Sequence, residues 1–218
     1  MAAGARERIQ QAAVARFVAD GYAGTSMDGI RRSAGVSNGS LYHFFPRKAD
    51  LAAGLIVEGL GAYQQACLAA LGPHGDAPAG IAAVVAAHLG WIEANADLAR
   101  FLFAEVPDDV VLAAEPVLGD QNRRFVAALR AWLEPHQAAG TVMAGPWDVA
   151  HAVWFGPAQE LSRQWLRGRG RTRPTRAAAR LGAAAAIALT SPAASQSRPG
   201  ARGTSTNQAR ARRPARPT

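Results

Sequence analysis

Apolar residues recur at helical spacing along almost the whole chain. In the first segment Ile9, Ala13 and Phe17 fall four residues apart, which places them on one face of a helix, although Arg16 shares that face. No segment shows a convincing alternation of apolar and polar residues, which is the pattern of a half-buried β-strand. Alanine is abundant and β-branched residues are few, which also favours helix. The sequence therefore predicts an all-α protein.

Near the N-terminus, single residues mark where three helices begin and end. Gly21 is expected to end the first helix, because glycine tolerates the backbone conformation at a helix C-terminus. Ser26 and Ser37 are each placed to cap a short helix, and Gly35 separates the two. Pro46 stops the third helix. A long helix is then predicted from about residue 47 to residue 71.

The remaining pattern predicts a larger helical region and a tail. After a Gly/Pro-rich link at residues 72–79, helices are expected at 80–94, 97–105, 116–137, 146–167 and 174–189. Pro157 should kink the fourth of these helices, or split it after Gly156. From Ser191 onward bulky apolar residues are almost lacking, so a disordered tail is expected. The predicted domains are therefore residues 1–50, 51–190 and the tail 191–218.

Charge is distributed unevenly along this plan. The formal net charge is +8. Residues 1–50 hold seven basic and four acidic side chains, residues 51–162 hold four and twelve, and residues 163–218 hold thirteen arginines and no acid. A polyanionic partner, if there is one, therefore belongs to the two ends of the chain rather than to its middle.

Residues 24–51, GTSMDGIRRSAGVSNGSLYHFFPRKADL, are the most informative stretch. Two short helices joined by a glycine-containing turn form a helix-turn-helix. On a helical wheel the second helix points Leu41, Phe44 and Phe45 inward. Gly39 and His43 point outward, flanked by Ser40 and Tyr42, which suits close approach to a DNA major groove. The alternative interpretation is an ordinary helical hairpin at the protein surface.

Two further features of this stretch favour phosphate. Ser37 and Asn38 lie at a helix N-terminus, where free N–H groups and the helix dipole attract anions. Lys48, the only lysine of the chain, opens the following helix and is placed to meet a second phosphate.

The same stretch resembles the N-terminal DNA-binding domain of TetR-family transcriptional regulators. The resemblance covers about residues 5–52. It is carried by the Thr-Ser entry to the second helix, Ala-Gly-Val-Ser at the turn, Gly-Ser-Leu-Tyr-His-Phe-Phe on the recognition helix, and Lys48 followed by Leu51. Arg31 departs from the pattern, since the family usually has alanine there. The resemblance implies a three-helix DNA-binding domain followed by a helical domain that binds a ligand and dimerises.

The resemblance also implies roles for single residues. Thr25, Ser26, Tyr42 and Lys48 match positions that usually touch phosphates. Ser37, Asn38, Ser40 and His43 match positions that usually reach base edges or nearby backbone, and Gly39 lets the helix come close. The expected function is a homodimeric repressor that a small-molecule ligand releases from double-stranded operator DNA.

In this family the last two long helices usually pair with those of a second subunit. The sequence allows such pairing, because small alanines permit close helix approach and larger residues supply apolar bulk. The expected interface residues are Trp154, Leu161, Trp165, Ala177, Leu181, Ala184 and Ile187. The alternative is that these residues only pack inside one chain.

A ligand pocket is expected among aromatic and polar residues of the central helices, because small-molecule sites combine apolar walls with few polar groups. The candidates are Tyr63, His88, Trp91, Phe101, Phe103, Trp132, His151, Trp154 and Phe155. Each of them is also an ordinary core residue by type, so core packing remains the alternative.

The sequence gives no sign of an enzyme, a cofactor or a metal site. It has no H-E-x-x-H or G-x-S-x-G motif, and Pro146 and Trp147 follow Gly145 where a P-loop needs Lys and Ser/Thr. The five histidines are scattered, and a single cysteine, Cys67, indicates a reducing compartment. No signal peptide or membrane segment is recognised, so a cytoplasmic protein is expected. A carrier or enzyme that kept a degenerate DNA-binding domain is the competing class, which the intact recognition helix and Lys48 disfavour.

Overall fold

The computed structural model describes residues 4–72, 75–103 and 107–190, and these residues are helical with short connections. The helices in chain order are α1 (Ala5–Gly24), α2 (Met27–Ala34), α3 (Asn38–Phe44), α4 (Lys48–Leu71), α5 (Ala77–Ala94), α6 (Ala96–Leu102), α7 (Asp108–Ala138), α8 (Trp147–Leu166) and α9 (Pro174–Thr190). No strand occurs in the described ranges, so the predicted all-α class is confirmed. The expected disordered tail, residues 191–218, lies outside them.

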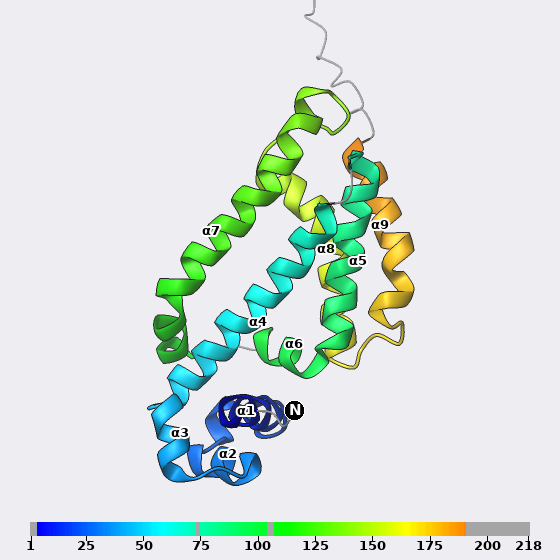
Figure 1. Ribbon diagram of the computed structural model, residues 1–218. Helices are drawn as coiled ribbons and strands as arrows, with labels where there is room; N and C mark the ends of the chain where they lie inside the picture. The colour runs from blue at the N-terminus through cyan, green and yellow to red at the C-terminus, as the bar shows by residue number, and fades with distance from the viewer. Residues whose placement is uncertain (1–3, 73–74, 104–106, 191–218) are drawn as a thin grey trace, which may run out of the picture.

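Two large hydrophobic cores divide the described part of the molecule, and Ile92, Ala99 and Leu166 form a small third cluster. Helices α1–α3 gather below the other helices, and α4 rises from them into the larger bundle of α5 and α7–α9 (Figure 1). The lower core holds Ile9, Phe17, Ile30 and Leu41, and the first half of α4 belongs to it through Leu51. The upper core is built from the second half of α4 together with α5, α7, α8 and α9. Helices α4 and α7 each run from the lower core into the upper one, and they join the two cores.

The lower core continues past the predicted boundary at residue 50. Phe101 of α6 is 6% exposed and stacks on Phe17 of α1, with ring centroids 5.0 Å apart. Val110 and Ala114, at the start of α7, are buried in the same core. Helix α6 therefore packs directly on α1, and the start of α7 is buried in the same core.

Helix boundaries differ from the prediction mainly at prolines. Helix α7 begins at Asp108, eight residues before Pro116, and it runs through both Pro116 and Pro135. Pro107 precedes this start and two aspartates lie in the first turn, where negative charge stabilises a helix. The pattern of apolar residues did not indicate this start. Helix α8 likewise continues through Pro157 rather than splitting after Gly156.

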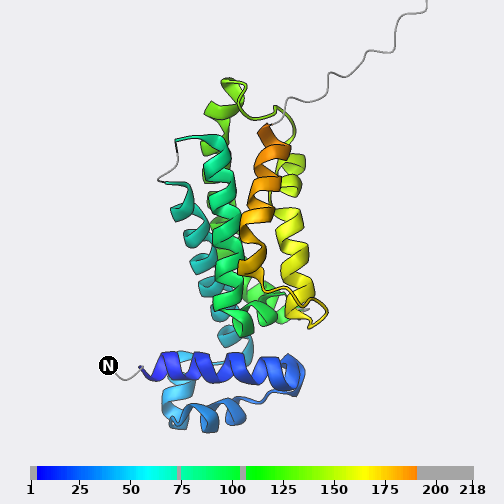
Figure 2. The same ribbon diagram turned by 90° about the vertical axis from the view of Figure 1, so that its right-hand side faces the viewer.

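Helix α5 begins at Ala77, inside the predicted link. Its N-cap is Asp76, whose carboxylate accepts a hydrogen bond of 3.1 Å from the Ala79 N–H. The helix is long and apolar enough to cross a membrane by length and composition alone. It is nevertheless a core helix here, because residues spaced along its length, from Ala77 to Ile92, are buried. Figure 2 shows it lying between α4 and α9.

Close helix packing in the upper core depends on two glycines. A Cβ atom at Gly182 of α9 would lie 3.1 Å from the backbone of Ala82 on α5. A Cβ atom at Gly80 of α5 would overlap the indole ring of Trp132 on α7. The absence of a side chain at these positions therefore sets how near α9 and α7 come to α5.

Candidate nucleic-acid interface

Side-chain caps and one left-handed residue build the α2–turn–α3 unit. The Ser26 hydroxyl oxygen accepts a hydrogen bond of 3.1 Å from the Gly29 N–H. The Ser37 hydroxyl oxygen does the same for the Ser40 N–H, also at 3.1 Å. Between them Gly35 has φ +62°, in the left-handed region, and ends α2. Both predicted caps and the predicted glycine break are confirmed.

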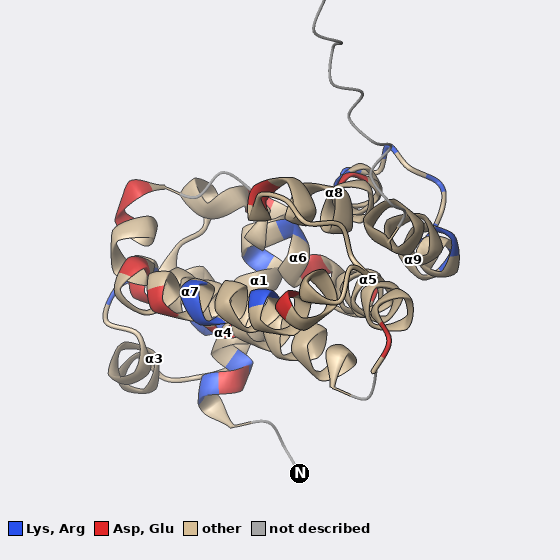
Figure 3. Ribbon diagram, turned by 90° about the horizontal axis from the view of Figure 1, so that it is seen from above, with Lys and Arg blue, Asp and Glu red and all other residues tan. Residues whose placement is uncertain are grey.

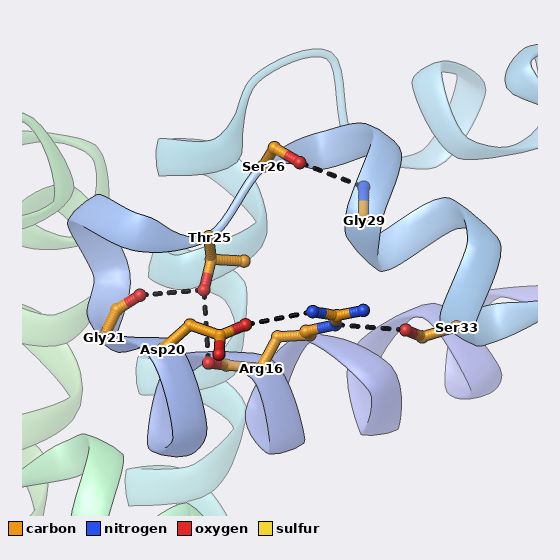
Figure 4. Close-up of polar contacts among 7 residues, drawn as sticks. All are labelled: Arg16, Asp20, Gly21, Thr25, Ser26, Gly29 and Ser33. Atoms are coloured by element: carbon orange, nitrogen blue, oxygen red, sulfur yellow. Dashed lines mark hydrogen bonds and ion pairs between the residues drawn. The ribbon is translucent and has the colours of Figure 1, made fainter.

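The joint between α1 and α2 is closed by Thr25. Its side chain is buried at 4% exposure, and its hydroxyl lies 2.8 Å from the Gly21 carbonyl oxygen and 3.2 Å from that of Arg16 (Figure 4). Gly21 has φ +72°, so the helix path breaks where the sequence predicted. Arg16 then bridges outward, pairing with Asp20 at 3.0 Å and donating to the Ser33 hydroxyl oxygen at 3.1 Å.

Lys48 is tied to the same joint. Its ammonium group donates to the carbonyl oxygens of Tyr22, at 2.7 Å, and Thr25, at 2.8 Å. It also lies 4.3 Å from the centre of the Tyr22 ring. The Tyr22 hydroxyl donates to Asp109 of α7 at 3.2 Å. Burial, together with the Asp109 carboxylate, raises the pKa of Tyr22 to about 12. Thr25 and Lys48 therefore serve first to position α2 and α3 against the rest of the protein.

The outer face of α3 carries the residues that were predicted to meet DNA. Asn38, Gly39, Tyr42 and His43 are exposed, and Ser40 is half-buried. Leu41 is fully buried beneath the helix. The prediction that Phe44 points inward is wrong, because its side chain is 39% exposed. Leu41 and Phe45, which are 0% and 4% exposed, already fill the space under this seven-residue helix.

Most of the basic side chains around α1–α3 have acidic neighbours. Arg31 and Arg32 both pair with Asp28, and Arg47 pairs with Asp50. Hydrogen bonds from Arg31 hold the pKa of the Asp28 carboxyl below its usual range. Arg6 likewise pairs with Glu58 of α4. These arginines are therefore held in exposed ion pairs, with Arg31 and Arg32 sharing one carboxylate.

Seven of the nine predicted pocket residues form one chain of ring contacts in the upper core. Adjacent rings in this chain have centroids 5.0–6.3 Å apart, and its members are Trp91, Tyr63, His88, Phe155, His151, Trp154 and Trp132. Phe101 does not join them, because it lies in the lower core against Phe17. Phe103 does not join them either, since it is 51% exposed at the end of α6.

A hydrogen-bonded group lies inside this aromatic chain. The Tyr63 hydroxyl is 3.0 Å from Nδ1 of His88, and the Ser162 hydroxyl is 3.2 Å from Nε2. His88 and Ser162 are each 1% exposed. Burial lowers the pKa of His88 to about 4, against a smaller opposing effect of the Ala158 carbonyl. His88 is therefore a neutral imidazole that hydrogen-bonds on both sides, a polar group within an apolar core.

Two surface hollows border the upper core and the junction of the two cores. A cavity of about 490 Å³ lies between α4 and α7, and its lining includes Gln64, Leu68, Gln121, Arg124 and Phe125. The side-chain oxygen of Gln121 is buried and has no hydrogen-bond partner in the described part of the chain. A second cavity of about 420 Å³ lies where α1 meets α4, α5 and α6. Of the predicted pocket residues, Trp91 lines the second cavity and none lines the first, because each cavity arises from the packing of distant segments.

The residues expected at a dimer interface divide into two groups. Trp154 is fully buried inside the single chain, and its indole N–H donates to the Ile81 carbonyl oxygen at 3.1 Å. The others remain accessible: Ile187 is 65% exposed, Ala184 is exposed, and Leu161, Trp165, Ala177 and Leu181 are half-buried.

Within the described ranges, no group of three or more histidine, cysteine, aspartate or glutamate side chains is placed to hold a metal ion.

A capped helix-turn-helix with an exposed, hydrogen-bonding helix α3 lies at one end of a helical bundle, to which α4 and α7 join it. This arrangement defines a DNA-binding transcriptional regulator. Residues 9–55 match the family model described as bacterial regulatory proteins, tetR family. This region of the chain, which contains the helix-turn-helix, is therefore similar to the TetR-family regulators. No sequence relative is found among curated proteins.

Solved structures share the whole architecture. A tetR-family regulatory protein from Rhodococcus RHA1 is 23% identical, with a TM-score of 0.69 over 86% of this chain and 98% of that one. FadR from Bacillus subtilis, solved with stearoyl-CoA, is 18% identical, with a TM-score of 0.70 over 84% and 98%. The fatty acid degradation regulator FadR from Bacillus halodurans is 18% identical, with a TM-score of 0.71 over 85% and 96%. Because these sequence identities lie below 25%, the similarity to these structures establishes the fold alone.

Proposed function

We propose that the protein is a homodimeric repressor that binds a pseudo-palindromic operator and is released from it by a small-molecule ligand. The observation that carries the DNA-binding part is the outer face of α3. Ser37, Asn38, Ser40 and His43 supply hydrogen-bonding groups, and Gly39 removes the side chain that would hold the helix away from the groove. Ser26 and Tyr42 flank this face as phosphate contacts.

Thr25 and Lys48 act in this proposal mainly as positioning residues. Their polar groups are engaged by backbone carbonyl oxygens at the α1–α2 joint. An ammonium group has three donors, so Lys48 retains one donor for a phosphate while it holds the joint. The placement of α3 relative to α4 then depends on these hydrogen bonds.

Dimerisation is assigned to the exposed faces of α8 and α9. Ala183, Ala184, Ile187 and Ala188 form an exposed, uncharged face on α9, and Val149 of α8 is 49% exposed. Small side chains with one large apolar residue suit close helix packing between two copies of this chain. Two recognition helices brought together in this way would meet successive major grooves about 34–36 Å apart.

Release by a ligand is assigned to the cavity between α4 and α7. The cavity has an apolar wall and several amide side chains. The buried, unpartnered side-chain oxygen of Gln121 would accept a hydrogen bond from a donor group of the ligand. A ligand that separates α4 from α7 would tilt α4, and α4 carries Lys48 and the α1–α3 core at its other end. The stearoyl-CoA bound to FadR of Bacillus subtilis shows that this fold accommodates a long acyl ligand. Acyl-CoA esters are therefore the first ligands to test.

The test is a fluorescence-anisotropy titration at physiological salt. The probe is the duplex upstream of the protein's own gene, and a scrambled duplex is the comparison. We expect affinity for the first to exceed that for the second by at least about a thousandfold, with two chains per duplex. His43→Ala should weaken only specific binding, while His136→Ala on α7 is the matched control and should change neither. The proposal would be refuted if the wild type bound both duplexes equally and if selection from a random duplex library also gave no preferred sequence.

A further inference from the structure

The connection between α8 and α9 is an arginine-rich loop. Residues 167–173 read RGRGRTR, and residues 163–180 together hold seven arginines and no acid. The loop has an ordered start: the Gly168 N–H donates to the Trp165 carbonyl oxygen at 2.9 Å, and the Arg169 N–H donates to that of Gln164 at 2.9 Å. Gly168 has φ +69°, which turns the chain back on itself. Arg167, Arg169 and Arg171 are exposed on this turn.

These three arginines are not neutralised by neighbouring acids. Among the described residues none of them forms an ion pair, whereas Arg173 pairs with Glu93 at 2.8 Å. The acids nearest the loop are already engaged. Glu93 also accepts from the Thr175 hydroxyl, Asp97 pairs with Arg100, and Glu160 pairs with Arg163. The loop therefore presents three uncompensated positive charges within five residues.

The fold directs this loop toward the DNA-binding end of the molecule. Helix α8 runs toward α1–α3 and α9 runs away from them, so their connection lies at the near end of the upper bundle (Figures 1 and 2). Arg100 of α6 donates to the Leu166 carbonyl oxygen at 3.2 Å, which fixes the base of the loop against the helix that packs on α1. Figure 3 shows the basic residues of the loop along the α8–α9 edge.

The α1–α3 unit itself has few uncommitted cations to offer a polyanion. Arg16, Arg31, Arg32 and Arg47 are held in ion pairs, and Lys48 is held by two carbonyl oxygens. Binding of a duplex depends strongly on neutralising its phosphates. Within the described ranges, the α8–α9 loop presents a group of arginines without ion pairs at the end of the upper bundle that faces α1–α3.

We infer that Arg167, Arg169 and Arg171 form a second contact with DNA, made to the phosphate backbone and independent of sequence. The inference rests on the proposed function, because it needs the recognition helices to bring a duplex to this end of the molecule. If α8 and α9 form the dimer face, the loops of the two subunits lie close to the symmetry axis and place six arginines over the centre of the operator. The loop adds affinity, and α3 supplies the choice of sequence.

The salt dependence of binding tests the inference. The full-length protein is compared with Arg167→Gln/Arg169→Gln/Arg171→Gln and with a control at two arginines of α7 outside the proposed ligand cavity, Arg123→Gln/Arg130→Gln, whose effect is compared per charge removed. Each protein is titrated against the operator duplex and a scrambled duplex at several salt concentrations, after circular dichroism has shown that all three are equally folded. Each lost phosphate contact makes the slope of log Kobs against log salt shallower by roughly 0.9. We expect the loop variant to flatten the slope by about 2 to 5 on both duplexes, and to leave the ratio of their affinities unchanged.

A loop variant whose slopes match those of the α7 control would overturn the inference. This failure is distinguishable from failure of the proposed function. If the wild type binds the operator specifically and only the slopes are unaffected, the DNA-binding function stands and the loop contact falls. If the wild type does not discriminate between the duplexes, the proposed function falls, and the slopes on the scrambled duplex still decide whether the loop meets phosphate.

Discussion

The buried imidazole of His88 makes the stability of this protein fall as the solution becomes acidic. Folding lowers the pKa of His88 from about 6.5 to about 4, because the ring is 1% exposed and its charged form would be desolvated. In mild acid the unfolded chain therefore binds a proton at this position that the folded chain does not bind. Stability is fully present above pH 6.5 and is lost progressively as the pH falls toward 4.

The magnitude follows from these two values. The difference in proton binding costs about 0.2 kcal/mol at pH 7, about 2 kcal/mol at pH 5, and at most about 3.4 kcal/mol below pH 4. Between pH 7 and pH 5 the free energy of unfolding should therefore fall by about 1.8 kcal/mol on account of this residue alone. In a chain of this size such a loss lowers the melting temperature by roughly 4–7 °C.

The assay is urea unfolding followed by circular dichroism at pH 7 and pH 5, at one fixed protein concentration. His88→Gln keeps hydrogen-bonding groups facing Tyr63 and Ser162 but cannot take up a proton, so it should lose about 1.8 kcal/mol less than the wild type over this interval. His43→Gln, at an exposed position on α3, is the matched control. His151, whose pKa is also lowered by burial, is present in every variant and cancels. Equal losses in the wild type and His88→Gln, to within about 0.5 kcal/mol, would refute the argument.

Three further predictions concern packing and hydrogen bonds. Gly80→Ala should destabilise the protein by about 1–3 kcal/mol, because the new methyl group overlaps Trp132. Gly90→Ala on the same helix has free space and should stabilise the protein by up to about 1 kcal/mol. Urea unfolding midpoints in the opposite order would contradict this packing. Ser37→Ala should lower the free energy of unfolding by about 1 kcal/mol, because it removes the cap of α3, while Ser37→Asp should preserve it. Chemical denaturation measures both variants, and equal losses of stability would show that the cap is unimportant. Lys48→Met should lower the free energy of unfolding by about 2–3 kcal/mol, because two charge-assisted hydrogen bonds to carbonyl oxygens are lost. The melting temperature should therefore fall even without DNA. A change confined to DNA affinity would instead assign Lys48 to a phosphate contact.

The local structure of the N-terminal region was predictable from sequence because its signals are local. Ser26 and Ser37 cap the helices that follow them, and Gly21 and Gly35 adopt left-handed backbone angles where the helices break. Each of these features depends on a residue and on neighbours within four positions. The same locality explains the exposed positions of Gly39, Tyr42 and His43, which follow from the helical period once the buried position of Leu41 is known.

Predictions that depended on contacts between distant segments fared differently. Phe44 lies on the exposed side of α3 because Leu41 and Phe45 already occupy the core below. Phe101 was grouped with the pocket aromatics by residue type, but α6 folds onto α1 and places it against Phe17. Trp154 was expected between subunits, and the packing of α8 on α5 buries it within one chain.

Helix period, caps and glycine breaks are properties of neighbouring residues, so the all-α class, the helix-turn-helix and the exposed outer face of α3 could be predicted without the fold. The fold was needed to establish that Thr25 and Lys48 close the α1–α2 joint, that His88 is neutral inside an aromatic core, and that the arginine-rich loop lies at the end of the upper bundle that faces α1–α3. Each of these depends on which helices meet. That is set by the shape and burial of side chains far apart in the chain, and no local pattern encodes it.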